Sequence, residues 1–291
     1  MSPGIEALIF PHSAEELLEH MRGGEPFVVH GAQSSNSELR ARPLLGSLES
    51  LLAGWPDPVE VFDPEVADEA SSSMVGADDA QELFAQGRTL LFSEVQLQVP
   101  GLIPWLEAIR AELGFSALTQ ERCLVYATPG GTGTATHFDQ NVNFVLQLHG
   151  TKRWFLAPNH NVSAPMTRHR LGQPLDPELA SYARLPMPAG LPEDCTEIVL
   201  EPGSVLFVPR GIWHATHAST DAVSLNFTFS APTWLDVFSA ALRGRLALSE
   251  EWRESAVPQD AATFEALLRE LADDMAHVHA TDILAATEGQ P

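Results

Sequence analysis

The sequence predicts a mainly β protein with flanking helices, and three observations support this fold class. Short strand-like runs fill the middle of the chain, helical patterns occupy both ends, and glycine, proline and asparagine separate the strand-like runs. With 291 residues, of which 44% are hydrophobic, the chain is long enough to bury a substantial core. We therefore expect a β-barrel or β-sandwich that carries helical additions.

Residues 1–92 are predicted to form a helix and loop region that adds one strand to the core. Ser13 precedes two glutamates and then apolar residues at helical spacing, which predicts a helix up to Met21. Two glycines and a proline end this helix, and residues 27–29 form a short apolar strand. Residues 66–79 are acidic and rich in serine without clear periodicity, so we interpret them as a mobile loop.

Residues 93–231 are predicted to form the core of the protein. Apolar residues at helical spacing across 105–113 predict one helix before the strands begin. The strand-like runs are residues 122–127, 142–148, 153–157, 197–200, 204–209 and 223–229. An insert from about 158 to 193 has little periodicity. Inserts of this length are often lids or binding loops, although a disordered connector is an alternative.

Residues 232–291 are predicted to be helical. Thr233 and Asp236 have the spacing of a capping box, which marks the start of a helix. Two apolar stripes follow at helical spacing: Trp234, Val237, Phe238, Ala241 and Leu242, then Phe264, Leu267, Leu268, Leu271 and Met275. These stripes could pack on the core, or they could form a homodimer interface, because exposed apolar stripes tend to find partners.

Charge and composition exclude several functional classes. A formal net charge of −23 argues against a nucleic-acid binder, which needs a basic surface, but it is compatible with a basic protein or peptide substrate. No apolar run is long enough to span a bilayer, so no membrane segment is expected, and residues 1–5 lack the basic start of a signal peptide. Two cysteines do not make a disulfide framework. We therefore expect a cytoplasmic protein with reduced thiols.

His137, Phe138 and Asp139 form the first motif that points to chemistry. Residues i and i+2 of a strand face the same side, so His137 and Asp139 can point into one space. Two histidines and one carboxylate make the facial triad that non-haem Fe(II) oxygenases use, and His214 offers the second imidazole. A simple surface pair of His137 and Asp139 is the alternative interpretation.

His214 competes with His217 for the third ligand position. The two are three residues apart, so in a strand they face opposite sides and only one can join His137. His214 directly follows a bend that contains proline and glycine, where a side chain is easily directed into a barrel mouth. We therefore prefer His214 and expect His217 to be a histidine of the core or one that supports the ligands.

Lys152 is the only lysine in a chain that otherwise uses arginine. A buried amine close to the triad would be a natural anchor for a dicarboxylate co-substrate. The glycine-rich run 128–134 lies just before His137, and glycines allow the backbone to approach a ligand closely. This pattern resembles an enzyme site more than a structural feature.

Three segments of the sequence resemble the JmjC-type, cupin-like 2-oxoglutarate oxygenases. Residues 134–154 look like the core of that family, residues 202–214 resemble its distal-histidine segment, and residues 24–29 resemble its N-terminal strand. The likeness spans about residues 15 to 230 and is greatest to the asparaginyl-hydroxylase-like and ribosomal-oxygenase-like groups. It implies a double-stranded β-helix (jelly-roll) core.

The resemblance also assigns expected roles to individual residues. The iron ligands of the family fall on His137, Asp139 and His214, and the basic residue for the distal carboxylate of 2-oxoglutarate falls on Lys152. Further co-substrate contacts fall on Thr134, Asn143 and Asn226, although a buried asparagine can also serve only to satisfy backbone groups. The family's co-substrate tyrosine has no secure counterpart here, and Tyr126 is a candidate.

The chemistry that the resemblance implies uses Fe(II), 2-oxoglutarate and O₂, and it hydroxylates a protein or peptide side chain with release of succinate and CO₂. A small-molecule hydroxylase of the same chemistry is an alternative, and demethylation through hydroxylation of an N-methyl group is chemically possible. A non-catalytic metal-binding cupin scaffold and a cupin enzyme that uses no oxoacid are further alternatives. The complete triad together with Lys152 favours catalysis.

Overall fold

The computed structural model describes residues 4–31, 37–56, 58–63, 71–257 and 260–287. The chain divides into two compact units. The first contains residues 1–114 and 120–230, and the second contains residues 115–119 and 231–291.

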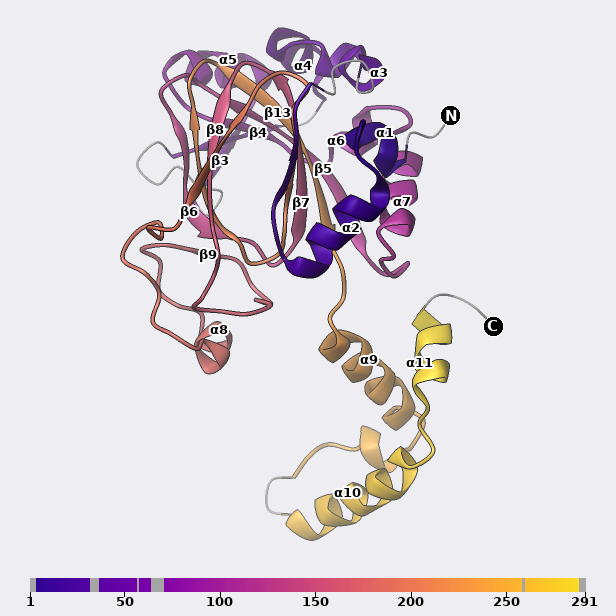
Figure 1. Cartoon of the computed structure of the whole chain (residues 1–291). Coiled ribbons are helices and arrows are strands. Elements are labelled where there is room, and N and C mark those ends of the chain that lie inside the picture. The colour runs from indigo at the N-terminus through magenta and orange to yellow at the C-terminus, as the bar shows by residue number, and fades with distance from the viewer. Residues whose placement is uncertain (1–3, 32–36, 57, 64–70, 258–259, 288–291) are drawn as a thin grey trace. The chain divides into compact units, whose positions relative to one another are not determined.

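Two antiparallel sheets form the body of the first unit (Figure 1). The larger sheet has the order β1 (Phe27–Val29), β11 (Val205–Val208), β7 (Val142–His149), β13 (Ala222–Ser230), β5 (Gln120–Thr128), β4 (Leu90–Phe92), β2 (Val59–Phe62) and β3 (Ser72–Val75). The smaller sheet has the order β10 (Thr196–Leu200), β8 (Lys152–Ala157), β12 (Trp213–Ala218), β6 (Gly133–Phe138) and β9 (His169–Arg170).

The order of the strands confirms the predicted jelly-roll class. From β5 to β8 and again from β10 to β13, most consecutive strands alternate between the two sheets. Every described pairing is antiparallel. The N-terminal region contributes four strands to the larger sheet, including the predicted strand 27–29. This topology brings residues that are far apart in the sequence onto facing strands.

Helices cover the outside of the larger sheet, and Figure 1 shows α1, α2 and α7 gathered beside it. Trp105 of α7 packs edge-on against Phe227 of β13, with ring centroids 4.6 Å apart. Asn226 and Thr228, the neighbours of Phe227 along β13, point to the opposite face and line a pocket. The helices of this unit are α1 (Ile5–Ile9), α2 (Ala14–Gly23), α3 (Ser37–Arg40), α4 (Leu48–Gly54), α5 (Ala77–Ala85), α6 (Val95–Gln98), α7 (Leu102–Glu112), α8 (Pro177–Tyr182) and the 3₁₀ turn η1 (Pro43–Leu45).

An apolar cluster fills part of the space between the two sheets. Its buried members come from both sheets: Val145, Trp154, Leu156, Leu200, Leu206, Val208 and Ile212. Burying these side chains contributes roughly 1.5–3 kcal/mol for each large one, which is the main force that holds the sheets together. Trp154 belongs to this cluster and also lines the pocket, so the core directly supports the site.

The insert at 158–193 is folded, so a disordered connector is excluded for this segment. It contributes β9, which pairs with β6, and α8, whose first turn is capped by Asp176. A second apolar cluster joins the insert to the smaller sheet through Phe138, Ala157, Val162, Leu179 and Trp213. Phe138 follows the predicted metal ligand His137, and Trp213 precedes the predicted ligand His214. The insert therefore packs against the strands that carry both histidines.

The prediction of a loop across 66–79 was wrong for the residues that can be compared. Residues 64–70 lie outside the described part of the chain, but Ser72–Val75 form β3 and α5 begins at Ala77. Strand β3 has hardly any buried residues, so its sequence lacks an apolar alternation, and it forms because β2 supplies backbone partners. Asp78 and Asp79 occupy the first turn of α5, where negative charge is favourable.

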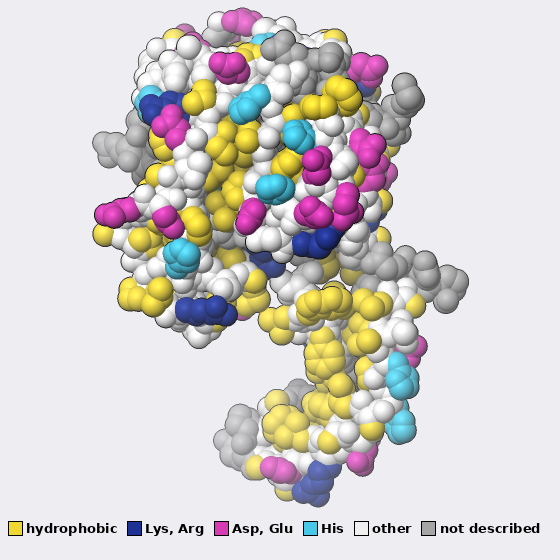
Figure 2. All heavy atoms as spheres, viewed as in Figure 1, with side chains coloured by type: hydrophobic (Ala, Val, Ile, Leu, Met, Phe, Trp, Pro, Cys, Tyr) yellow, Lys and Arg dark blue, Asp and Glu magenta, His cyan; other side chains and the backbone are white. Residues whose placement is uncertain are grey.

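The second unit is a set of helices: α9 (Trp234–Leu246), η2 (Glu251–Arg253), α10 (Ala261–Met275) and α11 (Ala280–Thr287). The predicted capping box of Thr233 and Asp236 is present at the start of α9. Neither α9 nor α10 has a buried residue, and Figure 2 shows apolar side chains crowded on the visible face of this unit. Among the described residues, no helix is both long and apolar enough to cross a membrane.

Candidate active site

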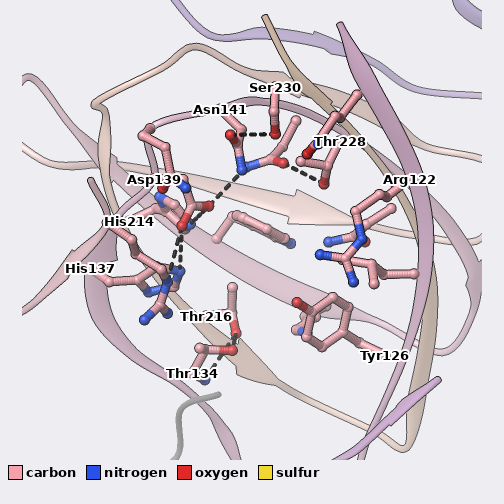
Figure 3. Close-up of a pocket in the computed structure, with 18 residues that line it drawn as sticks. Arg122, Tyr126, Thr134, His137, Asp139, Asn141, His214, Thr216, Thr228 and Ser230 are labelled. Atoms are coloured by element: carbon pink, nitrogen blue, oxygen red, sulfur yellow. Dashed lines mark hydrogen bonds and ion pairs between the residues drawn. The ribbon is translucent and has the colours of Figure 1, made fainter. Parts of the chain in front are cut away.

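A pocket of about 300 Å³ opens between the two sheets of the first unit. Polar side chains from β5, β6, β7, β8, β12 and β13 line most of it. Figure 3 shows His137, Asp139 and His214 on one side of this pocket, with Tyr126 and Arg122 on the opposite side. We call these two sides the triad end and the lysine end, because Lys152 lies near Tyr126.

Strand pairing brings the two histidines of the triad end together. His137 of β6 and His214 of β12 are directly opposite each other in the register, and their ring centroids are 4.1 Å apart. Asp139 comes just after β6 ends, and its two carboxylate oxygens lie 3.9 Å from His137 Nε2 and 3.7 Å from His214 Nε2. One donor atom from each of the three residues lies within 4.8 Å of the others.

Backbone carbonyls fix the orientation of both imidazoles. His137 Nδ1 is 2.7 Å from the carbonyl oxygen of Ala135, and His214 Nδ1 is 2.9 Å from that of Ile212. A carbonyl can only accept, so each Nδ1 carries the proton of this hydrogen bond, and in the neutral imidazole Nε2 is then the nitrogen that can bind a metal. This tautomer is the one that a metal requires.

Asp139 is held by two donors. Asn143 Nδ2 donates to Oδ2 at 2.8 Å, and Thr228 in turn donates to Asn143 Oδ1 at 2.8 Å. Arg168 Nε donates to Oδ1 at 3.1 Å and forms an ion pair with the same carboxylate. The carboxylate therefore has a defined orientation before any ligand enters.

Two glycines allow the ligand-bearing segments to approach each other. A Cβ on Gly133 would lie 1.8 Å from the carbonyl oxygen of Thr216, so only glycine permits the observed contact of β6 with β12. Gly211 has φ +86°, and its N–H donates to the carbonyl oxygen of Asp139 at 2.9 Å. This bond joins the segment before His214 to the segment that carries Asp139.

Lys152 is buried at the other end of the pocket. Its side chain is 3% exposed, and Nζ donates to Thr128 Oγ1 at 3.1 Å. No carboxylate of the described residues lies within ion-pair distance of Nζ, and burial lowers the pKa of Lys152 from 10.5 to about 8. A cation that is buried without an anion carries a desolvation cost, which an anionic ligand would offset.

Other polar atoms of residues that line the pocket also lack partners within the described part of the chain, among them Gln140 Oε1 beside Asp139. Asn226 Oδ1 and Trp154 Nε1 are buried without a hydrogen bond. Thr134 Oγ1 accepts from Thr216 Oγ1 at 2.9 Å, so its own hydroxyl hydrogen remains available to a ligand. Tyr126 lines the same wall, with its ring centroid 5.7 Å from Lys152 Nζ.

The structure brings together every residue that the sequence suggested for the site. These are Thr134, His137, Asp139, Asn143, Lys152, His214 and Asn226, and Tyr126 lies there as well. Their individual roles remain predictions, and Asn143 already uses both ends of its side chain within the protein. The expected supporting role of His217 was wrong: it lies on the opposite face of β12 and is exposed.

Sequence reasoning missed Arg168. It lies within the insert, in a segment without periodicity, and nothing in its neighbouring residues marks it as a partner of Asp139. Arg122, which lines the pocket and pairs with Glu94 at 2.5 Å, was also missed. Arg122 lies on β5 two residues before Leu124 and four before Tyr126, which both line the pocket. Alternation along the strand is the one signal that could have suggested that Arg122 faces the pocket as well.

The residues present fit a divalent metal and a dicarboxylate. Two imidazoles and one carboxylate are the donor set of non-haem Fe(II) sites, and their one-sided arrangement leaves further metal positions open. At the lysine end, a buried cation and other buried polar atoms without partners in the described chain could receive a second carboxylate.

Comparison with known proteins decides the family. The JmjC domain matches residues 108–237. The uncharacterized protein YxbC of Bacillus subtilis (strain 168) is 34% identical over 259 residues, which are 87% of this chain and 78% of that protein. The chain belongs to the JmjC domain family. It is therefore an enzyme of the 2-oxoglutarate-dependent oxygenase class, for which Fe(II) and 2-oxoglutarate are the metal and co-substrate.

Two further proteins are similar to this chain. Ribosomal oxygenase 1 of Gallus gallus is 35% identical over 151 residues, which are 46% of this chain but only 22% of that protein. The solved structure of YcfD, a ribosomal oxygenase from Escherichia coli in complex with cobalt and 2-oxoglutarate, has a TM-score of 0.53 at 16% identity. It covers 90% of this chain and 67% of its own, and it shows that the fold is shared.

Proposed function

We propose that this JmjC protein hydroxylates a protein or peptide side chain in a reaction that requires Fe(II), 2-oxoglutarate and O₂. The observation that carries the proposal is a single pocket with two different ends. The triad end presents three metal donors, and the lysine end presents a buried cation for a dicarboxylate. A metal-binding scaffold would have no use for the second feature.

The proposed roles follow from the geometry of each side chain. His137, Asp139 and His214 would hold the metal on one face and leave the opposite face for co-substrate and O₂. Lys152 would bind the far carboxylate of 2-oxoglutarate through a charge-assisted hydrogen bond, which is strong because the amine is desolvated. Thr134 and Asn226 would complete the contacts with that carboxylate.

The bound metal would supply the oxygen chemistry of this family: substrate, 2-oxoglutarate and O₂ become hydroxylated substrate, succinate and CO₂. The chain itself contributes placement and the exclusion of water. Apolar side chains of the core close the pocket behind Trp154, which stacks on His214 at a centroid distance of 5.6 Å. Asn143 keeps Asp139 oriented, so that little reorganisation is needed when the site is loaded.

A macromolecular substrate is supported by two observations. The formal charge of −23 would attract a basic protein or peptide through long-range electrostatics. Ribosomal oxygenases are among the similar proteins, and both the name of the avian relative and that of the bacterial structure identify them as such. The substrate of this chain would accordingly be a basic protein segment that reaches the pocket between the sheets.

Release of succinate from 2-oxoglutarate tests the chemistry, and intact-mass comparison tests the substrate. Purified enzyme with Fe(II) and 2-oxoglutarate should produce more succinate when the protein fraction of a cell extract is added than when the small-molecule fraction is added. The modified protein should gain the mass of one oxygen atom. Stimulation by the small-molecule fraction alone would contradict a protein substrate, and the loss of a methyl group would indicate demethylation instead.

We also propose that the second unit joins two copies of the chain. Trp234 is 78% exposed and Leu248 is 84% exposed, and α9 and α10 bury no residue within the second unit. Such apolar surface is unfavourable in water unless a partner covers it. Light scattering should give twice the mass of the chain, and Phe238→Asp on α9 should reduce it to that of one copy. A monomeric wild-type protein would contradict this proposal.

A further inference from the structure

We propose that Arg168, which the insert carries into the pocket, is a positioning residue for the metal ligand Asp139. The inference rests on the proposed metal site, because it assigns a role toward that site to a residue outside the triad. It also gives the insert a function that its sequence did not suggest. Three sets of contacts support it.

The first set lies between Arg168 and Asp139 themselves. Arg168 Nε donates to Oδ1 at 3.1 Å while Asn143 Nδ2 donates to Oδ2 at 2.8 Å. With one donor on each oxygen, rotation of the carboxylate about its Cβ–Cγ bond would break one of the two hydrogen bonds. The carboxylate would therefore present itself to a bound metal in one fixed orientation.

The second set fixes the segment that precedes Arg168. Arg210 donates from Nε to the carbonyl oxygen of Pro165 at 2.8 Å and from Nη2 to that of Ala164 at 3.2 Å. The Tyr182 hydroxyl accepts from the Met166 N–H at 3.0 Å. Arg210 lies four residues before the ligand His214, so the insert is attached directly to one ligand-bearing segment.

The third set fixes the residues that follow Arg168. His169 and Arg170 form β9, which pairs with β6 opposite Phe138 and His137. The Leu171 N–H donates to the carbonyl oxygen of Thr136 at 2.9 Å. Arg168 is therefore held on one side by β6 and on the other by Arg210, in the segment that leads into β12.

Two effects of Arg168 on metal binding oppose each other. Its positive charge repels a divalent cation, whereas its hydrogen bond fixes the ligand. The side chains of Arg168 and Asp139 are 21% and 18% exposed, so solvent screens the repulsion only in part. Loss of a residue that orients a metal ligand typically lowers metal affinity by about 10- to 100-fold. We therefore expect orientation to outweigh repulsion.

Binding of Co(II) to the protein without co-substrate tests the proposal independently of catalysis. Calorimetry would give the affinity, and the visible absorption of bound Co(II) would report its coordination. Arg168→Ala should bind Co(II) about tenfold more weakly and should change the absorption spectrum. Arg168→Lys, which keeps the charge and much of the length, should recover part of both. Arg184→Ala is the matched control, because Arg184 is an exposed arginine of the same insert.

The outcomes separate this inference from the proposed metal site. If wild-type protein binds no Co(II), or binds it equally well as His137→Ala, the metal site itself is wrong. If wild-type protein binds Co(II) through the triad but Arg168→Ala has the same affinity and spectrum, or binds more tightly, the role of Arg168 is overturned. A similar loss of affinity in Arg184→Ala would show that any change in the insert disturbs the site, and it would also overturn the specific role of Arg168. Far-UV circular dichroism of each variant would establish that the fold is intact.

Discussion

The two ends of the pocket differ in how far the protein satisfies its own polar groups. At the triad end, both imidazoles donate to backbone carbonyls, and Asp139 accepts from an asparagine and an arginine. At the lysine end, Lys152 has a single hydroxyl partner, and the neighbouring Trp154 Nε1 has none among the described residues. The metal ligands are thus held by hydrogen bonds within the protein, whereas the buried cation has no anionic partner among the described residues.

This difference indicates how each end is expected to recognise its ligand. A metal site needs its donors oriented in advance, so the hydrogen bonds around the donors are formed within the protein. A co-substrate site gains affinity when the ligand satisfies groups that are otherwise buried at a cost. Unpaired buried polar atoms in a folded protein are uncommon, and those on residues that line the pocket, such as Gln140 Oε1, Trp154 Nε1 and Asn226 Oδ1, are therefore informative.

The largest expected effect on activity comes from removing a metal ligand at the triad end. His214→Ala should lower the rate of succinate formation by about 100-fold or more, because the metal contributes several kcal/mol to the reaction. His217→Ala is the matched control: it lies on the same strand but is exposed on the other face, and it should keep wild-type activity. Equal loss of activity in both variants would contradict the assignment of the ligands.

Replacement of Lys152, at the lysine end, should have the next largest effect, and this effect should fall on co-substrate binding. Lys152→Met should weaken 2-oxoglutarate binding by roughly 10- to 100-fold, the range expected for a hydrogen bond to a charged group. Co(II) affinity should change little, because Lys152 contacts none of the three ligands. Arg153→Met, at the next residue and exposed on the opposite face, serves as the control. An unchanged affinity for 2-oxoglutarate would rule out the proposed role of Lys152.

The same substitution should stabilise the protein in the absence of ligand. The pKa of Lys152 falls from 10.5 to about 8 because burial disfavours the charged amine. Below pH 8 the folded protein must keep this amine protonated, which costs about 3 kcal/mol. Between pH 8 and 10.5 the folded state releases the proton first, so the wild-type protein gains stability as pH rises.

Denaturant unfolding at several pH values measures this effect. Lys152→Met should be more stable than wild type at pH 7, and the difference should shrink as pH rises from 8 toward 10.5. In the same pH range the wild-type affinity for 2-oxoglutarate should fall, since the free enzyme loses its cation. A stability difference that does not depend on pH would show that the amine is not the cause.

The smallest effects should come from the two asparagines, and they should differ in kind. Asn143→Ala removes the donor to Asp139 and leaves Thr228 without its acceptor, so it should lower stability by about 1–3 kcal/mol and weaken Co(II) binding. Asn226→Ala removes an unpaired buried oxygen, so it should leave stability nearly unchanged and weaken 2-oxoglutarate binding by up to about tenfold. If the two variants changed stability, Co(II) affinity and 2-oxoglutarate affinity in the same way, the proposed difference in role between the two asparagines would be wrong.

Much of the site could be predicted from the sequence because its key residues lie on regular strands. Alternation along β12 made it possible to choose His214 over His217 as the ligand. Strands with a continuous apolar run, such as Val205–Val208, could be recognised directly from the sequence. Strands without an apolar pattern, such as β3 and β9, were missed because partner strands, not their own residues, stabilise them. Arg168 could not be found, since its position depends on how an aperiodic insert folds back onto β6.

The register that places His214 opposite His137 has a consequence for how the protein matures. The two histidines are 77 positions apart in the chain, and the strands between them include members of both sheets. Their donor atoms can converge only after long-range pairing is complete, so the nascent chain cannot assemble the triad early. Since a ligand that binds only the native state shifts the equilibrium toward it, metal availability would set the abundance of the folded enzyme as well as its activity.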